Sequence, residues 1–352
     1  MRPSGSSIHA RHCKWFPGKG ATRLEPLIEE PEATTPKKLN VSCAKRLDKI
    51  GLLTTNKLRA DSIGKGKLGT MSSILQRVAP IGEARDREIL KDAATYVYAQ
   101  RPQGEVLAHL FLPESRNPTP RPVVVFFHGG FWDSPTPTQF VPQCLHFASR
   151  GAVAVAAETR TLAKNGTGAV EAIEDARDLI RWLRHNADTF NLDPHKITIG
   201  GAGGGAYLAL LCSMPKPKNL PPIDGLECFP QALILFSSLV NTASKGPITD
   251  RFPNAKTAKQ LSPTSLIRRK LPPILFFHGK SDRITPFEEV DKFRRRMRWR
   301  GNSCVLVDYE KADHSFFNFN VSHKNFESSI NAADHFLVDL GLLPPEDAPE
   351  IR

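Results

Sequence analysis

The chain has 352 residues, of which 40% are hydrophobic and 24% are charged, as in an ordinary globular protein. This composition excludes wholly disordered, collagen-like and disulfide-rich chains, and the length suits one large domain with additional sequence. The net charge is +12, but residues 1–70 hold 14 Lys and Arg against 6 Asp and Glu, a net of +8. The basic excess therefore belongs mainly to an N-terminal arm. The rest of the chain is nearly balanced in charge, so the total charge gives little support for nucleic-acid binding by the main domain.

The cysteines, histidines and carboxylates indicate no metal or redox site. The six cysteines include no C-x-x-C pair, which argues against zinc ribbons and thioredoxin-like motifs. Several of them lie in apolar runs, where a reduced and buried thiol is the simplest interpretation. No His, Asp or Glu pattern has the spacing of metal ligands, so we expect no metal and no other cofactor.

Hydropathy predicts no membrane-spanning segment. The longest uncharged stretches, 197–215 and 228–244, are interrupted by glycines or end in polar residues. Neither forms a continuous run of about 20 apolar residues. The N-terminus is basic but lacks the apolar core of a secretory signal, which favours a cytoplasmic location.

Residues 1–90 are predicted to form a basic, mostly disordered N-terminal arm. Gly, Pro and basic residues are scattered through it with weak hydrophobic periodicity, and one short helix is predicted near residues 71–78. The favoured interpretation is a solvated tail, or sequence that precedes a true start at Met71. The alternative is an electrostatic anchor to nucleic acid or acidic surfaces.

From residue 92 onward, predicted strands alternate with predicted helices. Apolar runs predict strands at 95–99, 106–112, 123–127, 152–156, 196–199, 232–236, 274–277 and 304–309. Helices are predicted at 139–149, 169–184, 207–212, 287–298 and 326–340. The alternation predicts an α/β domain over residues 91–343, with a mostly parallel central sheet and helices on both faces. Residues 240–271 lack clear periodicity and are interpreted as a cap or insertion, and 344–352 as a tail.

Three predicted strand ends carry residues suited to catalysis. Residues 128–132 read His-Gly-Gly-Phe-Trp, and paired glycines after a buried strand can point N–H groups at a ligand oxygen. Asp282 follows the strand at 274–277 and can orient an imidazole, and His314 follows the strand at 304–309 and can act as a general base. The alternatives are an ordinary Gly-Gly turn, a turn aspartate and a surface histidine. They are less favoured because ligands bind at the carboxyl ends of parallel strands, where all three groups lie.

These motifs resemble the α/β-hydrolase esterases and lipases, in particular the hormone-sensitive-lipase-like and carbohydrate-esterase-like members with a His-Gly-Gly motif. The resemblance covers roughly residues 92–341. It includes Glu-Thr-Arg at 158–160, and Asp-Pro-His-Lys-Ile-Thr-Ile-Gly-Gly at 193–201, which is similar to the family's lead into its nucleophile. The resemblance implies an α/β-hydrolase fold.

The resemblance also implies roles for individual residues. Asp282 would orient His314, in the chain order of the family. The backbone N–H groups of Gly129, Gly130 and Gly204 would form an oxyanion hole, which stabilises the negative charge that develops on a substrate oxygen.

The sequence departs from the family at the nucleophile itself. The family motif is G-x-S-x-G, whereas residues 201–209 read Gly-Ala-Gly-Gly-Gly-Ala-Tyr-Leu-Ala. Alignment on the flanking motifs puts Gly203 at the position of the serine, and a frame shifted by one residue puts Ala202 there. Neither residue is a nucleophile, so we expect no acyl-enzyme by the family's route.

Several interpretations remain open at this stage. The first is a carboxylic-ester hydrolase whose activity is weak or lost, the second is a non-catalytic pseudoenzyme that binds a small carboxylate or ester, and the third is a decaying gene copy. In the first two interpretations the partner is a small-molecule ester or carboxylate, and no nucleic acid is expected. The oligomeric state cannot be inferred from the sequence. A dinucleotide fingerprint, with Gly201, Gly203 and Ala206 and an acid at Asp224, is disfavoured because several strands precede it.

Overall fold

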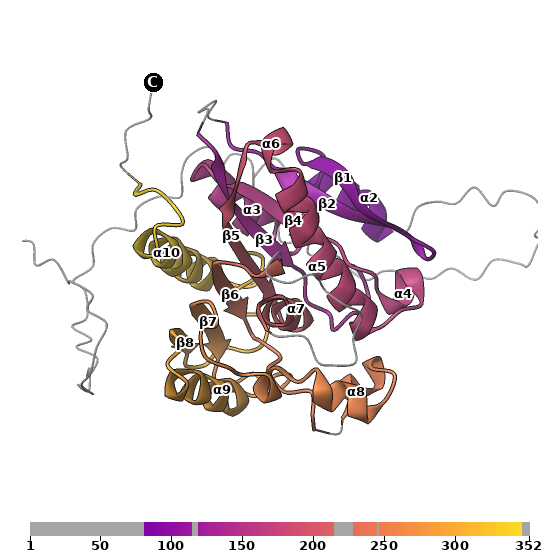
Figure 1. The fold of residues 1–352 in the computed structure, drawn as a ribbon, viewed down its shortest axis with the longest axis vertical. Helices are drawn as coiled ribbons and strands as arrows, with labels where there is room; N and C mark the ends of the chain where they lie inside the picture. The colour runs from indigo at the N-terminus through magenta and orange to yellow at the C-terminus, as the bar shows by residue number, and fades with distance from the viewer. Residues whose placement is uncertain (1–80, 115–118, 215–227, 245, 347–352) are drawn as a thin grey trace, which may run out of the picture. The chain divides into compact units, whose positions relative to one another are not determined.

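Eight strands form one mostly parallel sheet in the computed structural model, which describes residues 81–114, 119–214, 228–244 and 246–346 (Figure 1). The strand order is β1-β2-β4-β3-β5-β6-β7-β8. The strands are β1 (Ala94–Arg101), β2 (Gly104–Phe111), β3 (Arg121–Phe127), β4 (Val153–Ala157), β5 (Leu192–Ala202), β6 (Ala232–Phe236), β7 (Ile274–Gly279) and β8 (Cys304–Tyr309). β2 pairs antiparallel with β1 and β4, and the other neighbours are parallel. The α/β prediction is confirmed, and the strands lie within a few residues of their predicted positions.

The central strands are apolar because both of their faces are buried. β3 lies between β4 and β5, with Val125 opposite Val155 on one side and Ile199 on the other. Side chains alternate along a strand, so Val125 joins one apolar layer while Val124 and Phe126 join the layer on the opposite face.

Helices cover both faces of this sheet (Figure 1). α5 (Ala169–His185), α7 (Gly204–Ser213) and α9 (Phe287–Trp299) contribute to one apolar core cluster. α3 (Val141–Ser149) and α10 (His323–Asp339) contribute to the second cluster, on the other face. The shorter elements are α4 (Leu162–Asn165), α6 (Ala187–Phe190), α8 (Ala255–Gln260) and the 3-10 turns η2 (Pro247–Arg251) and η3 (Pro263–Ser265). Within the described ranges, no helix is both long and apolar enough to cross a membrane.

One helix lies inside the segment 1–90 that was predicted to be disordered. α2 (Ile81–Ile89) ends at Ile89, and Ile89 and the following Leu90 are buried in the cluster of the α3–α10 face. The hydroxyl of Thr138 donates to Asp86 Oδ1 at 3.0 Å and ties this helix to the loop before α3. Sequence periodicity missed α2 because its buried residues lie only at its end. The rest of the predicted arm, including the helix near 71–78, is outside the described residues, as is Asp224.

The segment 240–271 consists of short elements that pack onto the body. Phe252, Ala258 and Leu261 belong to the core cluster of the α5–α7 face. Tyr207 of α7 donates a hydrogen bond from its hydroxyl to the backbone oxygen of Leu261 at 3.1 Å. These contacts place the segment against the helix that follows β5.

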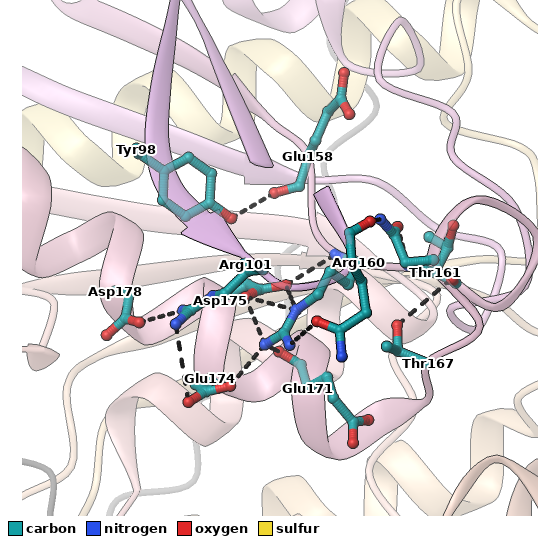
Figure 2. A network of polar contacts seen from close by, with 12 residues as sticks. Tyr98, Arg101, Glu158, Arg160, Thr161, Thr167, Glu171, Glu174, Asp175 and Asp178 are labelled. Atoms are coloured by element: carbon teal, nitrogen blue, oxygen red, sulfur yellow. Dashed lines mark hydrogen bonds and ion pairs between the residues drawn. The ribbon is translucent and has the colours of Figure 1, made fainter. Parts of the chain in front are cut away.

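A buried ion-pair network joins the end of β4 to α5 and β1 (Figure 2). Asp175 of α5 is fully buried and accepts hydrogen bonds from the backbone N–H and from Nε of Arg160, each at 2.9 Å. Arg101 of β1 donates to the same carboxylate at 3.1 Å, and Arg160 also reaches Glu174 at 2.6 Å. A buried carboxylate is stable only with such partners, so the network fixes the segment that follows β4.

Glu158, two residues earlier, has its own set of partners. Its carboxylate lies 3.1 Å from His109 Nε2 and accepts a hydrogen bond from Lys164 at 2.7 Å. Tyr98 donates to its backbone oxygen at 2.7 Å, a contact visible in Figure 2. Burial would raise the pKa of Glu158, but the hydrogen bonds from His109 and Lys164 outweigh it and lower the pKa to about 2.

Candidate active site

Gly203 occupies a sharp turn between β5 and α7. Its backbone has φ +50° and ψ −110°, a conformation that side chains other than that of glycine adopt only with strain. Its N–H donates to the backbone oxygen of Phe236 at 3.1 Å, and its own oxygen accepts from the N–H of Tyr207 at 3.1 Å. A strand–turn–helix of this kind is the geometry that exposes a nucleophile at the end of a central strand.

Gly205, two residues after Gly203, allows α7 to approach the sheet closely. A Cβ atom placed on Gly205 would lie 2.1 Å from the backbone oxygen of Phe127 at the end of β3. This separation is far inside van der Waals contact, so only glycine fits. The run of glycines that could have indicated a dinucleotide fingerprint therefore has a packing role at a turn that follows the fifth strand of the chain.

Asp282 and His314 form a hydrogen-bonded pair at the ends of β7 and β8. His314 Nδ1 lies 2.8 Å from Asp282 Oδ2, and Asp282 Oδ1 accepts from the backbone N–H groups of Ile284 and Thr285, each at 2.9 Å. Burial would raise the pKa of Asp282, but hydrogen bonds from His278 and His314 outweigh it and hold the pKa well below its usual range. Asp282 is therefore a fixed anion that orients the ring of His314.

The other ring nitrogen of His314 faces the turn at Gly203. A Cβ atom built on Gly203 would lie 3.3 Å from His314 Nε2 and 3.4 Å from Phe131 Cζ. The rings of Phe131 and His314 also stack, with their centroids 6.0 Å apart. Gly203, Asp282 and His314, which follow three different strands, thus meet in space.

The His-Gly-Gly loop lies directly against this turn. A Cβ atom on Gly204 would be 2.9 Å from Phe131 Cα, so the loop backbone contacts the start of α7. The N–H of Gly129 donates to Gln139 Oε1 at 2.7 Å. Among the described residues, no acceptor is found for the N–H groups of Gly130 and Gly204, so these two are the available donors of the predicted oxyanion hole.

The His-Gly-Gly loop has a strained backbone, and a hydrogen bond from the segment after β4 stabilises it. Gly130, Phe131 and Trp132 all have positive φ, at +91°, +50° and +64°, although two of them carry bulky side chains. The N–H of Leu162 donates to the backbone oxygen of Trp132 at 2.8 Å. Because the network at Asp175 fixes the segment after β4, that network also supports this loop. Strained backbone of this kind is typical of functional loops.

A cavity of about 370 Å³ adjoins His314. Its walls include Gly129, Gly130 and Ala202 on the sheet side, Asn318 after β8, and Arg85 from α2. The lining is mixed polar and apolar, and its size suits a small organic group. Sequence analysis missed the contribution of Arg85, since α2 lies in the predicted arm.

Sequence analysis also missed two residues that organise the site. The hydroxyl of Thr285 lies 2.8 Å from Asp282 Oδ2 and 3.1 Å from His314 Nδ1. Gln139 links the N–H of Gly129 to Asn318 Oδ1, with its Nε2 at 3.2 Å from that oxygen. The only available signal for Thr285 was its place three residues after Asp282, and no pattern in the sequence indicated Gln139.

Two family models match the chain. Residues 109–227 match the model described as BD-FAE, and residues 252–337 match the dienelactone hydrolase family. The turn at Gly203 lies in the first range, and the Asp282–His314 pair lies in the second.

Among curated proteins, the chain is similar to esterases. It is 26% identical over 161 residues to esterase LipQ of Mycobacterium tuberculosis, across 41% of this chain and 38% of that protein. It is 23% identical over 241 residues to isoprenylcysteine alpha-carbonyl methylesterase ICME of Arabidopsis thaliana, across 62% of this chain and 55% of that protein. The chain thus spans about half the length, or less, of these curated relatives.

The similarity to solved structures is more extensive. The native thermophilic esterase from Thermogutta terrifontis superimposes with a TM-score of 0.68 and 32% identity, over 74% of this chain and 96% of that chain. The butyrate-bound form of the same esterase gives a TM-score of 0.68 and 33% identity, over 73% of this chain and 97% of that chain.

Proposed function

Because the chain belongs to the α/β-hydrolase esterase family, we propose that it acts on small carboxylic esters at the site formed by Gly203, Asp282 and His314. The observation that carries the proposal is the Asp282–His314 pair, whose free nitrogen faces Gly203 at the position of a nucleophile. With glycine there, we expect hydrolysis to be weak.

In the proposed mechanism, water replaces the serine. A water molecule beside His314 Nε2, in the space that a serine oxygen would fill, attacks the ester carbonyl carbon while His314 takes one of its protons. Asp282 stabilises the imidazolium, and the N–H groups of Gly130 and Gly204 stabilise the oxyanion. The tetrahedral intermediate then collapses, the proton on His314 passes to the leaving alcohol, and the products are a carboxylic acid and an alcohol.

Such a site would retain only a small part of a full triad's rate. Loss of a triad serine costs on the order of 10⁶-fold in kcat, whereas binding and the oxyanion hole leave roughly 10³–10⁴-fold over water. The proposed activity is thus detectable above the uncatalysed reaction but is poor for an esterase.

Gly203→Ser tests the proposal directly. The substitution would complete a Ser-His-Asp triad, and we expect hydrolysis of p-nitrophenyl acetate to rise by a factor on the order of 10², because the positive φ strains the new serine. Gly203→Ala is the matched control, since it adds the same Cβ and strain without a nucleophile. A folded Gly203→Ser protein that is no faster than Gly203→Ala would refute the assignment of Gly203.

A second candidate function is non-catalytic binding of a small carboxylate. The observation that favours it is the cavity beside His314, together with the similar esterase structures that hold propionate and butyrate. Calorimetric titration of butyrate into the native chain distinguishes the two functions. Tight binding without ester turnover supports the non-catalytic binding function, and turnover that is lost in His314→Ala supports the hydrolase.

A further inference from the structure

Basic residues gather at the C-terminal end of α9. The segments 268–270 and 291–300 together hold nine Lys and Arg against one Asp, a net charge of +8. Residues 71–352 as a whole carry +4, so everything else in that part of the chain carries a net −4. Positive charge is therefore concentrated in one place while the remainder is acidic.

Asn302 holds the two segments together in space. Its Nδ2 donates to the backbone oxygen of Arg268 at 2.7 Å, and its Oδ1 accepts from the N–H of Leu271 at 3.0 Å. Its own N–H donates to the backbone oxygen of Met297 at 3.0 Å. The loop before β7 and the end of α9 thus form one surface. We call this surface the basic edge; its exposed residues are Arg268, Arg269, Lys270, Arg295, Arg296, Arg298, Trp299 and Arg300.

Few of these charges are neutralised within the fold. Asp291 pairs with Arg294 and, at 3.2 Å, with Arg295. Within the described part of the chain, Arg296 and Arg298 have no ion pair. The other acidic residues of α9, Glu288 and Glu289, lie in its first turn, where Glu289 pairs with Lys292 at 3.2 Å. The cations at the end of α9 are therefore available to an external anion.

Trp299 stands among these cations and is 79% exposed, more than any other large hydrophobic side chain described. The guanidinium of Arg300 lies over its ring, 5.0 Å from the centroid. An indole combines a large apolar face with one N–H donor, and tryptophan is enriched where a membrane meets water. An exposed tryptophan surrounded by arginines is therefore suited to the headgroup region of a bilayer.

The basic edge lies at the opposite end of the sheet from the candidate active site. Residues 268–270 precede β7, whereas Asp282 follows it, and a strand of six residues spans roughly 20 Å. α9 lies beside β7 and β8 at the border of the sheet (Figure 1). Contact through the basic edge would leave the cavity beside His314 open to water.

We propose that the basic edge docks the protein onto an anionic membrane surface, with its Arg and Lys side chains on lipid headgroups and Trp299 inserted at headgroup depth. Clusters of roughly four to eight cations on an amphipathic helix bind anionic lipids, and the attraction grows with each cation. Single-stranded nucleic acid is less favoured as the occupant, because its binding sites use several aromatic platforms along a groove. The inference goes beyond the proposed esterase function and does not depend on it.

Co-sedimentation with vesicles tests the proposal. The full chain is mixed with phosphatidylcholine vesicles containing about one third phosphatidylserine, because cations on the protein respond to the anionic fraction. We expect Arg296→Glu/Arg298→Glu to weaken partitioning by about tenfold or more. Lys311→Glu/Lys324→Glu is the matched control, since it makes the same charge change at exposed lysines outside the basic edge. The N-terminal arm is unchanged in both variants, so its own attraction cancels in the comparison.

Tryptophan fluorescence gives a second measurement. We expect the emission of the native chain to shift to shorter wavelength with anionic vesicles, and this shift to be lost in Trp299→Ala. Equal partitioning of the two double variants would overturn the proposal. Unchanged vesicle binding, combined with lost binding of an oligonucleotide in Arg296→Glu/Arg298→Glu, would overturn it in favour of nucleic acid.

Discussion

At the scale of single residues, one hydroxyl links three groups of the candidate site. The Thr285 hydroxyl lies 2.8 Å from Asp282 Oδ2, and 3.1 Å from both His314 Nδ1 and the backbone oxygen of Ser237. The N–H of the same residue also donates to Asp282. Thr285 therefore fixes the orientation of the carboxylate on which the histidine depends, without facing the substrate itself.

Replacement of this hydroxyl should lower turnover more than substrate binding. In the Gly203→Ser background, we expect Thr285→Val to reduce kcat for p-nitrophenyl acetate about tenfold, with KM changed less than about threefold, because positioning is lost and contact with substrate is not. Thr264→Val is the control, since it removes a comparable hydroxyl bond to the backbone oxygen of Val240. A similar loss in the control, or a change confined to KM, would argue against a positioning role.

The strand-end rule predicted Asp282 and His314, the resemblance to the esterases placed Gly203 by alignment, and the fold brings the three residues together. Asp282 and His314 were predictable because parallel strands end at the same edge of the sheet, so the loop after each strand was enough to locate them. Thr285 and Gln139 were not predictable in this way. Their contacts depend on how a loop turns and on which rotamer a side chain adopts, and neither leaves a pattern in the sequence. The catalytic roles themselves stay predictions.

At the scale of elements, the end of β4 depends on ionised carboxylates. Glu158 lies between His109 and Lys164 and has a pKa of about 2, against an ordinary value of 4.5. A folded-state pKa below the unfolded value means that ionised Glu158 stabilises the fold above about pH 4.5. That contribution is lost progressively as the pH falls from 4.5 toward 2.

Glu158→Gln should therefore cost less stability in acid than near neutrality. We expect the difference in unfolding free energy between native chain and variant to be about 2 kcal/mol smaller at pH 3 than at pH 6, measured by urea denaturation. Glu288→Gln, at an exposed position in the first turn of α9, is the control and should show little such change. A pH-independent difference for Glu158→Gln would contradict the assignment of its low pKa.

Most elements of the sheet were predictable because apolar runs bounded by turn residues allow few alternatives. The strands at 232–236 and 304–309 coincide with the observed β6 and β8. α2 and the short elements between 240 and 271 were not predicted. They are stabilised by tertiary contacts such as those of Ile89 and Leu261, which do not produce a period in the sequence.

At the scale of the whole molecule, the basic edge and the candidate active site lie at opposite ends of the sheet. Sequence patterns did not reveal the basic edge, because its two segments are about 20 residues apart in the chain and Asn302 joins them only in the fold. The total charge also concealed it, since the acidic remainder cancels part of the positive charge. Only the fold shows that one end of β7 adjoins the cations and the other adjoins the Asp282–His314 pair.

The two helical layers also contain natural chemical reporters. Cys144 lies in α3 on one face of the sheet and Cys212 in α7 on the other, and both are free and buried. Burial raises the pKa of Cys212 to about 12 and that of Cys144 further still, so neither thiol reacts until its surroundings open. In variants whose only remaining cysteine is Cys144 or Cys212, the rate of modification by a thiol reagent would time the opening of each layer separately. The order in which the faces of the sheet come apart could then be measured without introducing a foreign probe.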